Sequence, residues 1–150
     1  MATLGKLGRG RKAELLRDIA LFQTCNRREL AQVAALTIDI ELDEGTMLTR
    51  EGHAGGLAYV IVNGTAEVTR KGRRIATLGP GAVVGELSLI DGKPRSASVR
   101  ATSDLQVLEL DAHDLRRLLD RAPHVLHKLL EALSLRIREV DTVSASGRLP

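Results

Sequence analysis

The spacing of apolar residues changes along this chain, and each change marks a different kind of element. From Lys12 to Ala34 the apolar positions follow the helical period in two short stretches, and Asn26 is placed to cap the second. From Leu36 to Leu110 short alternating or β-branched runs replace this pattern. Glycine-bearing turns separate the runs at intervals of roughly ten residues, which is typical of a β-sandwich or barrel. We expect about eight strands there.

The helical period returns between Asp111 and Asp141. Asp111 is a start signal for one helix, and Pro123 can open a second. The expected fold class is therefore α+β and mainly β, with helices before and after a β-barrel. We divide the chain into a flexible basic leader (1–11), one domain that includes the flanking helices (12–143) and a flexible tail (144–150).

Length and composition describe one globular domain. The chain has 150 residues, 43% hydrophobic and 27% charged, which suffices for one core but not for two domains of ordinary size. Phe22 and Tyr59 are the only aromatic residues, so a stacking platform for nucleic-acid bases is excluded. A formal net charge of +3 is low for a dedicated DNA-binding protein. We therefore expect an aliphatic core and no nucleic-acid binding by this chain alone.

The cysteine content and the N-terminus favour a cytoplasmic protein. Cys25 is the only cysteine, so no internal disulfide can form. The first ten residues do not resemble an export signal, and no apolar run approaches the ~18 residues of a membrane span. We expect no membrane partner.

One segment carries most of the chemistry. The strand-like pair Val83-Val84 runs into glycine and then into a short apolar turn over residues 86–90. If this turn is helical, the free amides after Gly85 form an anion site, because glycine lets a ligand approach the backbone closely. Arg95 follows across a loop and can fold back to the same point, where its planar guanidinium suits a phosphate.

A glutamate at an anion site needs a separate explanation. Glu86 would oppose a phosphate, but its carboxylate can accept a hydrogen bond from a sugar hydroxyl, which favours a nucleotide as the ligand. Ser96 adds a hydroxyl donor, and Ala97 is small enough to let the ligand lie against the strand. The alternative is a structural ion pair between Glu86 and Arg95, which the residue types alone leave open.

The sequence Gly85-Glu86-Leu87-Ser88 followed by Arg95-Ser96-Ala97 resembles the phosphate-binding cassette of cyclic nucleotide-binding domains. The resemblance covers roughly Cys25 to Asp141 and includes Glu51-Gly52 and Gly79-Pro80-Gly81 in the same order. It implies a jelly-roll β-barrel that binds a cyclic nucleotide, as in bacterial activators, cyclic-nucleotide-dependent kinases and gated channels.

The resemblance implies a role for each matching residue. Gly85 and Leu87 would offer backbone contacts, Glu86 would bind the ribose 2′-hydroxyl, and Arg95 with Ser96 would hold the cyclic phosphate. Two small residues would complete the motif: Ser88 and Ala97. Three aliphatic residues that alternation or the motif places near the base would form an apolar wall: Val68, Ile75 and Val83.

Two departures from the family pattern leave the base undecided. Val83-Val84 stand where many relatives have an aromatic residue. Val140-Asp141 lack the hydroxyls with which the bacterial activator selects adenine, and Thr142 is the nearest hydroxyl. The preferred ligand is cAMP, although Ser96 also suits cGMP; no further cofactor is expected.

The helix after Pro123 carries apolar residues at heptad spacing, namely Leu126, Leu130, Leu133, Ile137 and Val140, widened by Leu129. Such a stripe needs a partner. It can pack on its own barrel as a lid over the nucleotide, or it can pair with a second copy in a homodimer. The sequence leaves both open.

Other candidate sites are weaker. His124 and His127 lie one helical turn apart, but no cysteine or acidic cluster completes a metal site. Cys25 fits a buried thiol better than a nucleophile. The segment Gly52–Gly56 lacks the lysine and Ser/Thr of a Walker loop, so we interpret it as a turn. We expect no enzymatic activity.

The sequence thus predicts a sensor in which the phosphate orders the turn at residues 86–90, shifts Leu87 and Leu89, and repositions the helix after Pro123. The effector is unknown, and the length of the chain leaves any output to another protein or to another part of a longer chain. The alternatives are a structural or dimerisation module that has lost its ligand, the truncated sensor half of a CRP-like transcription regulator, and an enzyme that hydrolyses cyclic nucleotides.

Overall fold

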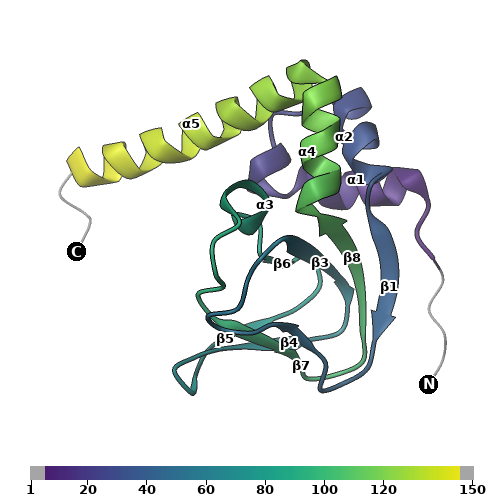
Figure 1. The fold of residues 1–150 in the computed structure, drawn as a ribbon, viewed down its shortest axis with the longest axis vertical. Coiled ribbons are helices and arrows are strands. Elements are labelled where there is room, and N and C mark those ends of the chain that lie inside the picture. Colours follow the sequence, from purple (N-terminus) through teal and green to yellow (C-terminus); the bar gives the residue numbers. More distant parts are fainter. Residues whose placement is uncertain (1–5, 146–150) are drawn as a thin grey trace.

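A computed structural model describes residues 6–145 (Figure 1). The helices are α1 (Arg9–Arg17), the 3-10 helix η1 (Ala20–Phe22), α2 (Arg27–Ala34), α3 (Ser88–Asp91), α4 (Ala112–Arg121) and α5 (Pro123–Ala145). The strands are β1 (Ile38–Leu42), β2 (Met47–Thr49), β3 (Leu57–Asn63), β4 (Ala66–Arg70), β5 (Arg73–Leu78), β6 (Val83–Val84), β7 (Ser98–Ala101) and β8 (Leu105–Asp111). The mainly-β class with flanking helices is confirmed.

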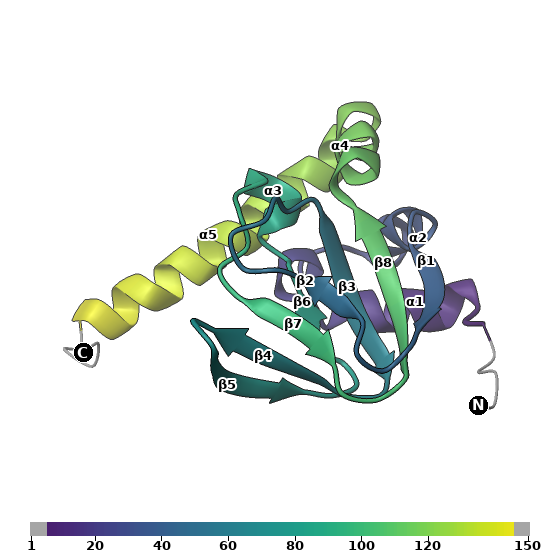
Figure 2. The same ribbon diagram turned by 60° about the horizontal axis from the view of Figure 1, so that its bottom comes forward.

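The strands form two antiparallel four-stranded sheets, with the orders β1-β8-β3-β6 and β2-β7-β4-β5 (Figure 2). The chain crosses between the sheets repeatedly, so β6 and β7, which flank the predicted cassette, belong to different sheets. The cassette therefore lies between the sheets rather than along one of them.

Strand β3 shows why the core has two parts. Alternate side chains of a strand face opposite sides of a sheet. Tyr59 and Ile61 lie in the cluster between the two sheets, whereas Ala58 and Val60 lie in the cluster formed with the helices. Both faces of β3 are buried, which explains its nearly continuous apolar sequence.

The helical side of the molecule is held by caps that the sequence predicts. Asn26 caps α2, and its side chain accepts a hydrogen bond from the Glu29 amide while the Glu29 carboxylate accepts one from the Asn26 amide. Asp111 caps α4 through the amides of His113 and Asp114. Pro123 is the first residue of α5, as expected.

The expected leader and tail have different bounds in the structure. Helix α1 begins at Arg9, three positions before Lys12. The preceding segment is anchored to β1, because the buried carboxylate of Asp39 accepts a hydrogen bond from the Leu7 amide at 2.7 Å. A local sequence pattern cannot predict this contact, because Leu7 and Asp39 are 32 positions apart. At the other end, α5 includes residues 144–145, and residues 1–5 and 146–150 lie outside the described part.

Helix α5 contacts the domain mainly through its first half. Val125, Leu129 and Ala132 are buried, at the spacing of one helical face. Among the described side chains of the predicted stripe, Leu126, Leu130 and Ile137 are exposed. The distal half of the helix extends away from the barrel (Figure 1). None of the helices in residues 6–145 combines the length and apolarity needed to cross a membrane.

Candidate functional site

The predicted anion turn forms between β6 and β7. Gly85 has a φ of +80°, which a glycine adopts at little cost, and the chain then enters the single-turn helix α3. The buried Ser88 donates its hydroxyl hydrogen bond back to the Gly85 carbonyl at 2.9 Å. The glycine and the serine of the motif therefore hold the turn together locally.

Arg95 folds back onto this turn, as the sequence predicts. Its guanidinium donates a hydrogen bond to the Leu57 carbonyl at the start of β3. A Cβ added to Gly85 would lie 2.1 Å from Arg95 Nη1 and 2.9 Å from the Leu57 oxygen. Only glycine at position 85 leaves room for the arginine, which is a second reason for this residue type besides its backbone angle.

The surroundings of Arg95 are partly desolvated. Burial lowers the pKa of its guanidinium from the ordinary value, and the nearby Tyr59 phenol acts in the opposite direction. Burial also raises the pKa of Tyr59, and the Glu109 carboxylate, to which Tyr59 is hydrogen-bonded, raises it further. An arginine remains cationic in such a place, so it offers a fixed positive charge with fewer competing waters.

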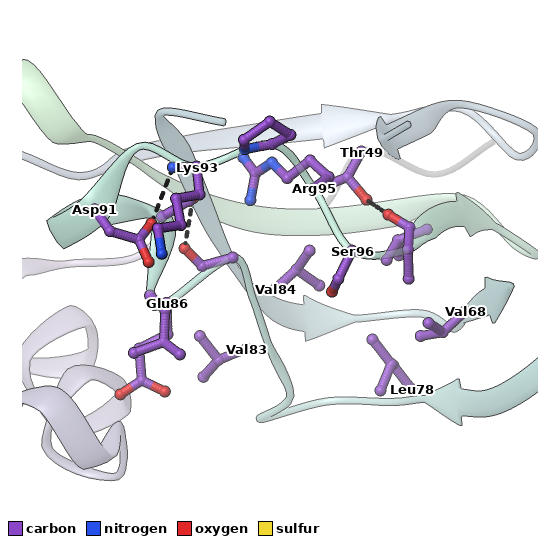
Figure 3. A pocket seen from close by; sticks show the side chains of 16 residues that line it. Thr49, Val68, Leu78, Val83, Val84, Glu86, Asp91, Lys93, Arg95 and Ser96 are labelled. Atoms are coloured by element: carbon purple, nitrogen blue, oxygen red, sulfur yellow. Dashed lines mark hydrogen bonds between the residues drawn. The ribbon is translucent and has the colours of Figure 1, made fainter. Parts of the chain in front are cut away.

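A cavity of about 550 Å³ opens beside the turn, a volume within the usual range of small-molecule sites, about 300–1,000 Å³. Its lining includes all the predicted site residues except one: Val68, Val83, Gly85, Glu86, Leu87, Ser88, Arg95, Ser96 and Ala97. The Ser96 hydroxyl is directed into the cavity, above the aliphatic side chains (Figure 3). The segments around Gly85 and Arg95, which the sequence separates by a loop, are brought together here.

Ile75 does not line this cavity, and its side chain is 51% exposed. The prediction from simple alternation was wrong because it put Ile75 on the wrong face of β5. Val68, which lines the cavity, pairs with Ala76, and directly paired residues point to the same side of a sheet. Ile75, the neighbour of Ala76, therefore points to the other side. Leu78, two residues beyond Ala76, lines the cavity instead.

Sequence reasoning missed several other lining residues. The most distant is Thr49 at the end of β2, whose hydroxyl donates a hydrogen bond to the Ala97 carbonyl at 3.0 Å. No motif singles out Thr49, because the pairing of β2 with β7 brings it to the site. Lys93 lies between the two halves of the cassette motif and adds a second cation to the lining. No aromatic ring belongs to the described residues that line the cavity.

Glu86 takes a direction that the sequence did not predict. Its Oε1 accepts a hydrogen bond from the buried Leu21 amide in η1 at 2.7 Å. Its carboxylate points away from Arg95 and Ser96, toward the helical segment (Figure 3). No ion pair joins Glu86 to Arg95 in the described part of the chain. The Glu86 side chain therefore borders the cavity, while its carboxylate holds η1 through the Leu21 amide.

Comparisons with known proteins agree with this geometry. The family profile described as "Cyclic nucleotide-binding domain" matches residues 39–122. The Cyclic AMP receptor protein of Thermus thermophilus is 36% identical over 103 residues, covering 65% of this chain and 48% of the relative. A cAMP-dependent protein kinase regulatory subunit of Yarrowia lipolytica is 36% identical over 111 residues, covering 73% of this chain and 28% of the relative.

Among solved structures, the N-terminal domain of a transcriptional regulator from Streptomyces coelicolor A3(2) superposes with a TM-score of 0.78. It is 32% identical, and the match covers 85% of this chain and 95% of that domain. The chain thus spans about half or less of the curated relatives named above, whereas its match covers nearly all of that N-terminal domain. On the profile match, the fold and the cassette, this chain belongs to the cyclic nucleotide-binding domain family.

Proposed function

We propose that this chain is a cAMP sensor that binds the nucleotide in the cavity beside the turn at Gly85, which Arg95 also lines. The observation that supports this most is the convergence of a glycine turn, a partly desolvated arginine and a serine hydroxyl on one cavity of nucleotide size. Arg95 and Ser96 would hold the cyclic phosphate. The relatives named for cyclic AMP favour cAMP over cGMP.

In this proposal the base rests on aliphatic side chains rather than on a stacked ring. Val68, Leu78 and Val83 lie on the side of the cavity away from Arg95 and provide an apolar surface for it (Figure 3). Such a surface favours any purine, so base selection would depend on further hydroxyl or backbone contacts. Cyclic GMP is accordingly the second ligand to test.

Thermal unfolding with increasing cAMP, cGMP and 5′-AMP tests this proposal. A ligand that binds only the folded state raises the melting temperature in proportion to the logarithm of its concentration above its Kd. We expect cAMP to give the largest shift and 5′-AMP the smallest, because its open phosphate is larger and more charged than the cyclic diester. Equal shifts for cAMP and 5′-AMP, or none, would contradict the proposal.

The same contacts also favour a second candidate, a structural module without a ligand. Arg95 and Glu86 each have a backbone partner already, namely the Leu57 carbonyl and the Leu21 amide. A module of this kind would need these side chains only for stability. The titration distinguishes the two candidates, because the structural module would show no shift with any nucleotide. We propose sensing rather than hydrolysis, and intact cAMP recovered after prolonged incubation would support this.

Nucleotide binding would affect α5 through η1. If the ribose recruits the Glu86 carboxylate, the Leu21 amide loses its acceptor and η1 loosens from the cassette. Helix η1 packs against α5, and the Thr24 hydroxyl, two residues after η1, donates to the Lys128 carbonyl in α5 at 2.5 Å. Hydrogen exchange of α5 should therefore change when cAMP binds, and Thr24→Val should reduce the change. An identical response in the variant would argue against this route.

The exposed stripe of α5 would pair with a second copy of the chain. Leu130 is 56% exposed and Ile137 is 62% exposed, at heptad spacing, which supports pairing of this face over its use as a lid. Sedimentation should give a dimer that Leu130→Glu converts to a monomer, with Arg116→Glu on the exposed face of α4 as the control. A wild-type monomer at high concentration would exclude pairing.

A further inference from the structure

A second cavity, of about 280 Å³, adjoins the nucleotide cavity and has no part in the proposed function. It is lined by all of β2, the loop that follows it, the first residue of β3, and Arg95. Thr49 and Arg95 line both cavities, so these two side chains form the wall between them. They lie together along one side of the nucleotide cavity (Figure 3).

The second cavity is lined by basic side chains without an acidic one. Arg50, His53 and Arg95 contribute three side chains with N–H donors, and no aspartate or glutamate belongs to its described lining. The neighbouring carboxylate of Glu51 is engaged elsewhere, because its Oε1 accepts a hydrogen bond from the Lys71 amide at 2.9 Å. A cavity with this charge attracts an anion.

The loop that lines the cavity contains the glycine-rich segment that the sequence led us to interpret as a simple turn. Its Ala54 and Gly55 line the cavity, and their amides make no hydrogen bond to another residue within 6–145. Gly55 is also closely packed, since an added Cβ would lie 2.8 Å from Ser88 Cβ in α3. The loop is therefore in contact with the cassette on its other side.

Backbone hydrogen bonds fix this loop to Arg95. The Arg95 amide donates to the His53 carbonyl at 2.8 Å, and the Gly52 amide donates to the Arg95 carbonyl at 2.8 Å. The guanidinium of the same residue donates to the carbonyl of Leu57, a residue that lines the second cavity. Arg95 is thus oriented toward both cavities at once.

We propose that the second cavity binds a phosphate-sized oxyanion through Arg50, His53 and the Ala54–Gly55 amides, and that this anion competes with the cyclic nucleotide for Arg95. The volume admits such an ion with part of its hydration shell. If the guanidinium binds an oxyanion in the second cavity, it cannot donate the same pair of N–H hydrogen bonds to a phosphate in the first. The anion would therefore set the nucleotide concentration at which the domain responds. The competition rests on the proposed nucleotide binding, whereas the anion site does not.

Calorimetric titration of inorganic phosphate into the nucleotide-free protein, at an ionic strength held constant with chloride, tests the anion site. We expect saturable binding that Arg50→Ala and His53→Ala each weaken about fivefold or more, since each removes a donor to a charged ligand. Ser96→Ala is the matched control, because Ser96 lines only the nucleotide cavity. Its affinity for phosphate should remain that of the wild type.

The competition is measured by titrating cAMP at several phosphate concentrations. The apparent Kd for cAMP should double when free phosphate equals its own Kd, and this dependence should disappear in the double variant Arg50→Ala/His53→Ala. Three results would overturn the proposal: no saturable phosphate binding, phosphate binding that the double variant leaves unchanged, or phosphate binding that Ser96→Ala abolishes. If the wild type binds phosphate in this way but no nucleotide, the proposed function fails and the anion site stands.

Discussion

The Leu21 amide donates a hydrogen bond to Glu86 Oε1 across 65 positions of the chain, and it joins the N-terminal helices to the turn that borders the cavity. Leu21 is fully buried, so its amide has no water to replace the carboxylate. The residue that the family resemblance assigns to the ribose therefore has a structural partner in this structure. If the proposed ribose contact also forms, one side chain serves both the ligand and the fold.

Replacing Glu86 with alanine should destabilise the ligand-free protein by about 1–3 kcal/mol, the range for a buried donor that loses its acceptor. Glu86→Gln should cost less, because the amide oxygen can still accept from Leu21. Urea unfolding without nucleotide measures both. Equal stability of the two variants and the wild type would mean that the contact contributes nothing.

The proposed contact of Glu86 with the ribose predicts that its substitution affects the affinities of two nucleotides differently. Glu86→Gln should weaken the binding of cAMP more than that of 2′-deoxy-cAMP, because only cAMP has the hydroxyl that would donate a hydrogen bond to the carboxylate. Calorimetry with both nucleotides on both proteins gives the comparison as a double-mutant cycle. Equal losses for the two nucleotides would assign Glu86 to η1 alone.

Much of this site could be predicted from sequence, because the cassette is a local motif. Gly85, Ser88 and Arg95 lie within eleven consecutive positions, 85–95, and their residue types suit a turn and a phosphate. The direction of Glu86 could not be predicted, since its partner is a backbone amide in a distant 3-10 helix.

The other differences between the sequence predictions and the structure also arise from contacts between residues that are not neighbours in the sequence. Ile75 was misplaced because only the pairing of Val68 with Ala76 shows which face of β5 points to the cavity, and Ile75 lies on the other face. Thr49 was missed because only the pairing of β2 with β7 brings it near Ala97. The fold class was predictable from glycine spacing and the change of period, whereas helix bounds depended on tertiary contacts such as Leu7 with Asp39.

The close approach of Arg95 to Gly85 predicts how a methyl group added at position 85 affects cAMP affinity. Gly85→Ala would place a Cβ 2.1 Å from Arg95 Nη1, so the guanidinium must move and cAMP affinity should fall about tenfold or more. Gly81→Ala is the matched control, with a φ of +90° but no atom within 4 Å of the added Cβ. Both variants strain the backbone, and calorimetry should show weakened binding only for Gly85→Ala. Comparable losses in both would attribute the effect to strain.

The thiol of Cys25 predicts a stability loss at alkaline pH. Burial, with a smaller contribution from Glu29, raises the pKa of Cys25 from 9.0 to about 11, while Lys128 acts in the opposite direction. The unfolded chain therefore releases this proton first, and the free energy of unfolding should fall as the pH rises from 9 toward 11, by at most about 3 kcal/mol. Cys25→Ala should remove this part of the pH dependence in urea unfolding. A slope in that window that is the same in both proteins would contradict the assignment.

Calorimetric titration of cAMP in phosphate-free buffer into the wild type, Arg95→Ala and Arg74→Ala tests the central claim most directly. Arg95 lines the cavity, whereas Arg74 is an exposed arginine of β5 outside it. Removal of a charge-assisted phosphate contact worth about 1.5–3 kcal/mol predicts a loss of roughly ten- to hundredfold in affinity for Arg95→Ala. Arg74→Ala should bind as the wild type does. Undiminished cAMP binding by folded Arg95→Ala would show that the nucleotide phosphate does not depend on this arginine, and the proposed site would be wrong.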